Sequence, residues 1–219
     1  MGILIKESQL KKNKVAFFAF LIMMFAVLAV ARAEGAIKFG LKGGVNFANM
    51  SGRDIDPGWK GTTRFAAGGF FALKINKLLA IQPEFFYSLK GGRWDSIFYG
   101  DQISVKANFA YLDIPFLVKI YIPMSAQSKL QPNFFLGPYA GIRMSAKIRV
   151  TTPDGSQEDD MEDPKSLDFG LTAGAGIDFS LGKGKLIFDV RYSLGLSTIS
   201  KIEEIKNNVF ALMAGYSFN

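Results

Sequence analysis

Carboxylates, lysines and arginines are the groups from which this chain would have to build a reactive site, because its 219 residues contain neither histidine nor cysteine. This composition excludes a Ser-His-Asp or Cys-His nucleophile, a zinc site with the usual ligands, haem attachment and a disulfide framework. Most familiar enzyme chemistry is therefore closed to the chain. We expect no catalytic residue, no cofactor and no metal site of a familiar kind.

The densest group of carboxylates lies between residues 154 and 163. It consists of Asp154, Glu158, Asp159, Asp160, Glu162 and Asp163. Oxygen ligands suit calcium or magnesium, but this spacing matches no known binding loop. The segment is therefore predicted to be a solvated, mobile surface loop. Bridging of divalent cations or lipopolysaccharide is the alternative function of the segment. If the protein were a hydrolase, it would need a catalytic pair of carboxylates such as Asp159 with Glu162.

A second set of charged side chains is spread through apolar stretches. In residues 168–179 the odd-numbered positions are apolar, whereas Asp168 and Asp178 occupy the even-numbered face. Alternation with a period of two indicates β-strands rather than helices. The pattern recurs in eight segments, at residues 37–48, 64–75, 79–90, 112–120, 134–148, 168–179, 186–196 and 210–218.

The lengths of these segments and of their connections indicate a membrane barrel. Each segment is near or above the roughly 9 to 11 residues that a tilted strand needs to cross the hydrocarbon layer. Long polar stretches at residues 49–63, 91–102, 151–165 and 197–207 alternate with connections at 76–77, 121–131 and 182–184, two of which are tight turns. Long loops at one end and short turns at the other are typical of outer-membrane barrels. The sequence therefore predicts an all-β fold, an eight-stranded antiparallel up-and-down transmembrane β-barrel.

The two faces of the predicted strands differ in charge, and this difference predicts which face meets lipid. A soluble ligand-binding barrel would place its apolar face inside. Strand length and aromatic residues near strand ends, such as Phe47, Tyr87 and Phe218, favour lipid outside. An eight-stranded interior is only wide enough for side chains, so the charges are predicted to pair across a plugged lumen, with a narrow solute channel as the alternative. The predicted ion-pair network consists of Glu84, Asp113, Lys119, Arg143, Lys147, Asp178, Asp189 and Arg191.

Two irregularities interrupt the strand pattern. Pro83, Pro115 and Pro138 fall inside predicted strands, although proline donates no hydrogen bond to a ladder, so we expect local bulges there. The apolar phase also slips between Phe109 and Leu112. A bulge near residues 110–112 would restore the register.

Residues 1–33 have the order of a secretory signal, with basic residues first, a charge-free apolar run at 15–31, and a cleavage motif that ends at Ala33. Cleavage there leaves residues 34–219 as one barrel domain and lowers the net charge from +7 to +3. Nucleic-acid binding, which needs a clustered basic face, loses its support. A permanent membrane anchor is the alternative, at the lower limit of spanning length.

Several motifs carry a resemblance that covers nearly the whole exported chain, in order. They are GLKGGVNFANMSG at 40–52, LAIQPEFFYSLKGG at 79–92, YLDIPFLVKIY at 111–121, FLGPYAGI at 135–142, DFGLTAGAGIDF at 168–179 and the final LMAGYSFN. Together they resemble the PorT-type outer-membrane β-barrel domain family of Gram-negative bacteria. The resemblance implies an eight-stranded barrel in the outer membrane. It implies no single activity, since some relatives are linked to protein secretion and most have no assigned role.

The function expected from the sequence is that of a non-enzymatic outer-membrane protein, a structural or interaction component of the cell envelope. The expected partners are outer-membrane lipid, lipopolysaccharide and the outer-membrane assembly machinery, with secretion or envelope proteins as further candidates and no nucleic acid. A narrow channel and, more weakly, a barrel hydrolase are the alternatives.

Overall fold

The computed structural model describes residues 37–98, 101–125, 127–161, 165–200 and 204–218, and these form strands and their connections. The predicted signal peptide, Glu162 and Asp163 lie outside the described residues. The eight long strands are β1 (Ile37–Ser51), β3 (Thr62–Lys74), β4 (Leu79–Phe98), β5 (Asp101–Tyr121), β6 (Leu130–Thr152), β8 (Leu167–Leu181), β9 (Gly184–Gly195) and β10 (Lys206–Phe218). Two short strands, β2 (Trp59–Lys60) and β7 (Gly155–Asp160), pair with β4 and β6 respectively.

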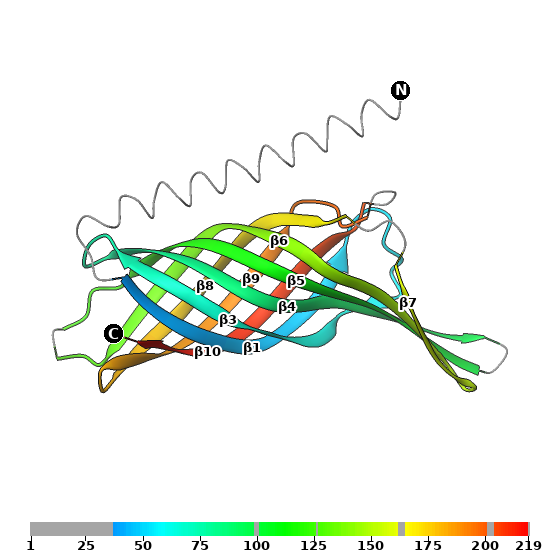
Figure 1. Cartoon of the computed structure of the whole chain (residues 1–219), viewed down its shortest axis with the longest axis horizontal. Coiled ribbons are helices and arrows are strands. Elements are labelled where there is room, and N and C mark those ends of the chain that lie inside the picture. Colours follow the sequence, from blue (N-terminus) through cyan, green and yellow to red (C-terminus); the bar gives the residue numbers. More distant parts are fainter. Residues whose placement is uncertain (1–36, 99–100, 126, 162–164, 201–203, 219) are drawn as a thin grey trace, which may run out of the picture.

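The long strands form one closed antiparallel sheet (Figure 1). Each pairs with its neighbours along the chain, and β1 closes the ring by pairing with β10 from Phe39↔Phe218 to Ser51↔Lys206. Closure leaves no open edge in the ring, as a lipid environment demands. The prediction of an eight-stranded up-and-down barrel is confirmed. Within the described ranges, no helix is long and apolar enough to span a membrane.

The alternating sequence pattern places apolar side chains outside and charged ones inside. Leu41 on β1 and Phe134 on β6 point outward and are 61% and 56% exposed, whereas Glu84 on β4 is fully buried in the interior. Outward aromatic pairs also form across strands, with Phe39 stacked on Phe218 at a ring separation of 5.1 Å. Such an outer surface is suited to acyl chains and not to water.

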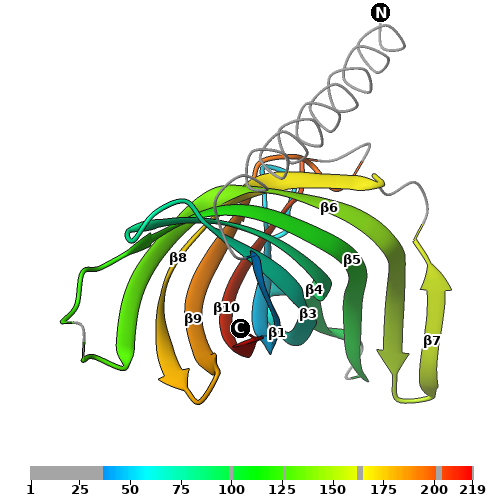
Figure 2. The same cartoon turned by 60° about the vertical axis from the view of Figure 1, so that its left-hand side comes forward.

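Two of the predicted long loops are instead extended strands. β4 and β5 stay paired as far as Phe98↔Asp101, and β6 folds back on β7 from Lys147↔Asp160 to Thr152↔Gly155. Both hairpins extend past the rest of the barrel (Figures 1 and 2). The predictions of loops at residues 91–102 and 151–165 were wrong because a hairpin with water on both faces needs no apolar alternation, which was the signal used to detect strands.

The three prolines do not produce the predicted bulges. Phe70 pairs with Glu84 and Leu73 with Ile81, so the register of β3 with β4 is the same on both sides of Pro83. Pro115 and Pro138 also lie within continuous registers. A proline is accommodated where the ladder omits a hydrogen bond, without insertion of an extra residue.

A bulge does occur at the level predicted from the phase slip, but on the neighbouring strand. Ala110 pairs with Ser145 and Tyr111 with Arg143, so Met144 of β6 is the extra residue. β5 itself keeps its phase, since Phe109 and Tyr111 are both buried inside. The slip in the sequence reflects an apolar interior at the loop end, where Phe109 and Tyr111 pack in a cluster with Met50.

Candidate functional site

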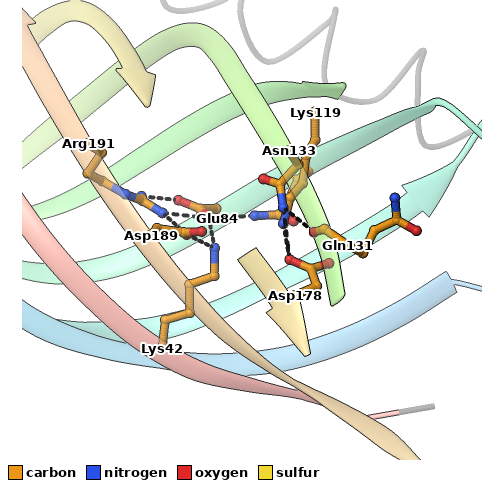
Figure 3. Close-up of polar contacts among 9 residues, drawn as sticks. Lys42, Glu84, Lys119, Gln131, Asn133, Asp178, Asp189 and Arg191 are labelled. Carbon is orange, nitrogen blue, oxygen red and sulfur yellow. Dashed lines mark hydrogen bonds and ion pairs between the residues drawn. The ribbon is translucent and has the colours of Figure 1, made fainter. Parts of the chain in front are cut away.

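The middle of the barrel interior holds a cluster of two acidic and two basic side chains (Figure 3). Lys42 Nζ lies 2.9 Å from Glu84 Oε1 and 2.6 Å from Asp189 Oδ2. Arg191 places Nη1 2.6 Å from Glu84 Oε2 and Nη2 2.8 Å from Asp189 Oδ2. All four side chains are almost completely buried. We call Lys42, Glu84, Asp189 and Arg191 the central cluster.

The strand register explains why these charges meet. Asp189 and Arg191 are two residues apart on β9 and so share its inner face, while Lys42 projects from β1 and Glu84 from β4. Two positive and two negative charges balance within the cluster. Each acid accepts from both cations, so the charges are paired, whereas Asp189 Oδ1 and Arg191 Nε are buried without a hydrogen-bond partner.

A second group, nearer the long-loop end, surrounds Lys90. Its Nζ lies 3.0 Å from Asp113 Oδ1 and 3.3 Å from Asp168 Oδ2. The same ammonium lies 4.7 Å from the ring centroid of Tyr111 and 4.9 Å from that of Tyr139, within cation–π distance. Lys90 with these four partners forms the loop-side cluster.

A third group lies toward the short-turn end. Lys119 Nζ lies 2.9 Å from Asp178 Oδ1, and Asn133 Nδ2 donates to the same oxygen at 3.1 Å. Lys119 also lies 5.5 Å from the ring centroid of Tyr121. Together with the central and loop-side clusters, this pair gives the barrel three layers of ion pairs along its axis.

Glycines make room for aromatic rings that pack against the cations of the central and loop-side clusters. Phe70 pairs with Gly40, Phe135 with Gly174 and Tyr139 with Gly170, and each ring lies over its glycine. A Cβ at any of these glycines would overlap both the ring and a backbone carbonyl.

The structure brings six of the eight predicted network residues into these layers, namely Glu84, Asp113, Lys119, Asp178, Asp189 and Arg191. Sequence reasoning left three further members out of the network: Lys42, Lys90 and Asp168. The signal for them was available, because each lies on the charged face of its strand. Arg143 is half-buried and belongs to none of the three layers.

Lys147 was wrongly placed in the interior. It is exposed, and its Nζ lies 3.0 Å from Glu158 Oε1 on β7. The extra residue Met144 shifts the alternation of β6 by one position, so Ala146 points inward and Lys147 outward. A slip of one residue moves every following side chain to the other face.

The acidic segment is partly ordered as β7. Glu158 accepts hydrogen bonds from Lys147 Nζ at 3.0 Å and from Arg149 Nη2 at 2.6 Å. All the residues of β7, with Asp159 and Asp160, are exposed, and Asp154 lies in the turn before it. In the part of the chain that the structure describes, no three acidic residues are grouped in a way that could hold a metal ion.

The Glu158 pairing predicts a pH response confined to this hairpin. Hydrogen bonds from Lys147 and then Arg149 lower the pKa of Glu158 from its ordinary value. Because the folded-state pKa is lowered, the pairing stabilises the hairpin above the ordinary carboxylate pKa of about 4.3 and is lost as the pH falls through the folded value. An NMR titration of the Glu158 carboxyl carbon checks this. Its midpoint should rise in a Lys147→Gln, Arg149→Gln variant, and an unchanged midpoint would contradict the pairing.

A small cavity with a lining of apolar and polar side chains lies between the central and loop-side clusters. It has a volume of about 40 Å³, and its polar lining includes Ser88, Lys90, Asp113 and Arg191. This volume has room for about three water molecules. The interior can therefore hold paired charges and a little water.

Comparison with known proteins gives one family match and several structural similarities. A family model described as "Outer membrane protein beta-barrel domain" matches residues 11–201. The fold is similar to OprG of Pseudomonas aeruginosa (16% identity, 84% of this chain, 96% of that chain, TM-score 0.47). It is also similar to neisserial surface protein A (13% identity, 84% of this chain, 98% of that chain, TM-score 0.45). A further similar structure is Ail of Yersinia pestis (15% identity, 84% of this chain, 99% of that chain, TM-score 0.37). No curated protein sequence matches the chain.

Proposed function

Since this chain belongs to the outer membrane protein beta-barrel domain family, we propose that it is a sealed, non-enzymatic barrel that serves as a structural or interaction component of the envelope. Its place is the outer membrane. The observation that carries the proposal is the interior itself, where Lys42, Lys90 and Lys119 are each paired with buried carboxylates in successive layers. A lumen filled in this way favours a role in contacts with other envelope components over transport or catalysis.

The two projecting hairpins are the parts best placed for contact. β7 pairs with β6 along one edge, and all its side chains are exposed. The β4–β5 hairpin carries charged side chains along its projecting part, where Arg93 and Asp95 form an ion pair at 2.6 Å. The resemblance to PorT-type barrels, some of which are linked to secretion, supports an envelope or secretion protein as the partner.

Crosslinking and pull-down from intact cells test the role of the hairpins. Replacing residues 149–158 by Asn-Gly joins the paired positions Ile148 and Asp159 through a two-residue turn and removes most of the β6–β7 hairpin, including Asp154 and Glu158. The same replacement of residues 96–103 shortens the β4–β5 hairpin between Asp95 and Ser104 as a matched control. Loss of a crosslinked partner in either variant supports contact through that hairpin. Retention of every partner in both would reject it.

A narrow channel is the second candidate, and the small cavity beside Lys90, Asp113 and Arg191 favours it. Single-channel recording in planar bilayers separates the two functions. For a sealed barrel we expect no conductance steps, because the central cluster fills the section that contains Glu84 and Arg191. Conductance steps in the wild-type protein would reject the sealed barrel and support the channel. A panel of esterase and peptidase substrates should show no turnover, which tests the weaker hydrolase alternative.

A further inference from the structure

The short-turn end of the barrel is strongly basic. Figure 1 shows the turns β3–β4, β5–β6 and β8–β9 at the same end as the C-terminal end of β10. The described residues of these turns and the strand ends beside them carry no aspartate or glutamate in ranges 74–79, 121–125, 127–130 and 180–186. Six lysines lie at this end: Lys38, Lys74, Lys77, Lys129, Lys183 and Lys185.

Three of these lysines lie at the turn tips, next to exposed apolar side chains. Lys77 precedes Leu78, and Lys129 precedes Leu130; the leucines are 45% and 47% exposed. Lys183 lies in the β8–β9 turn beside Leu181, which is 48% exposed. Water would not favour these leucines, whereas a membrane interface accommodates a leucine in its apolar part and a lysine at headgroup level.

The other three lysines extend the positive charge to the mouth of the lumen. Lys185 lies near Lys74 and Lys38, and Asp178 is its acidic neighbour. Lys74 Nζ lies 5.8 Å from the ring centroid of Tyr121, which faces the interior. Like charges held together at one end of a protein create a local positive potential that an anion relieves.

The long-loop end is different, because it carries acidic as well as basic side chains. Lys60 and Arg93 both contact Asp95, and Lys147 contacts Glu158. The excess of positive charge therefore belongs to the short-turn end and not to the barrel as a whole.

We propose that the short-turn end binds the phosphate groups of anionic phospholipids in the adjoining leaflet. The exposed leucines beside the lysines favour lipid over a soluble polyanion, because only lipid offers phosphate and acyl chains together. In an outer membrane the short turns face the periplasm, so the leaflet would be the inner one. This site is independent of the function of the hairpins and of whether the lumen is sealed.

Lipid selectivity of the reconstituted full chain tests the proposal. The probes are spin-labelled phosphatidylglycerol and phosphatidylcholine in phosphatidylcholine bilayers, and the measured quantity is the fraction of each label immobilised by the protein. A lysine beside an anionic surface contributes enough to favour the anionic lipid by about fivefold at low salt. We expect the wild-type protein to prefer phosphatidylglycerol by about that factor and a Lys77→Gln, Lys129→Gln, Lys183→Gln variant to lose most of the preference.

Control variants make the result specific. Replacing the same three lysines with arginine keeps the charge and should keep the preference. Removing three exposed cations at the other end, with Lys60→Gln, Arg93→Gln and Lys147→Gln, should leave it unchanged. The proposal is overturned if the turn-tip glutamine variant keeps the full preference or if the loop-end variant loses as much. It is also overturned if inorganic phosphate at constant ionic strength abolishes the preference, since the site would then take free phosphate.

Discussion

Replacing Glu84 by glutamine is expected to lower the free energy of unfolding of the barrel by roughly 3–5 kcal/mol. Glu84 accepts hydrogen bonds from both Lys42 Nζ and the Arg191 guanidinium, as Asp189 also does, and Glu84 has no exposure to solvent. When Glu84 is replaced by glutamine, the two buried cations, Lys42 and Arg191, share the single carboxylate of Asp189. A buried charge without its partner is costly because water is not available to replace the lost interaction.

Denaturant unfolding in lipid vesicles, followed by the gel mobility of unheated samples, measures this effect. Lys42→Gln added to Glu84→Gln removes one charge of each sign, so the double variant should be more stable than the sum of the single effects predicts. Glu158→Gln on the exposed hairpin is the matched control and should leave the unfolding midpoint unchanged. A Glu84→Gln protein with wild-type stability would show that the central cluster does not stabilise the barrel.

The second large effect is expected at Gly174, where alanine should destabilise the barrel by about 1–3 kcal/mol and valine by more. A Cβ at Gly174 would overlap the Val190 carbonyl and the Phe135 ring. Phe135 in turn lies 5.2 Å from the Arg191 guanidinium, so a displaced ring would disturb the central cluster as well. The interior is closely packed and has little space into which the ring could move.

The same unfolding measurement checks the Gly174 variants. Gly43→Ala is the matched control, because a Cβ there would have its nearest neighbour, the Ala66 carbonyl oxygen, at 3.7 Å, an ordinary contact. We expect Gly43→Ala to stay within about 0.5 kcal/mol of the wild type. Equal stability of the two alanine variants would contradict the role of Gly174 as the space in which Phe135 packs.

The barrel and most of its interior charges could be predicted from the sequence because a lipid-facing strand must alternate. The same reasoning failed where the physical cause of alternation ends. Past Met144, one extra residue reversed the faces of β6, and nothing in its composition marks the insertion, so Lys147 was assigned to the wrong side. β7 lies in water on both faces, and Glu158 is held by cations of a neighbouring strand that no local pattern relates to it.

The central cluster also bears on the order of assembly. Lys42 and Glu84 come from early strands, whereas Asp189 and Arg191 are separated from their partners by 147 and 107 residues of chain. Until β9 pairs with the sheet, Lys42 and Glu84 lack their ion-pair partners on that strand. Exposure of such groups to hydrocarbon is unfavourable, so a half-built sheet is a poor membrane intermediate. The interior charges are fully paired only when the last strands have joined the sheet. This dependence favours insertion of the sheet as a whole.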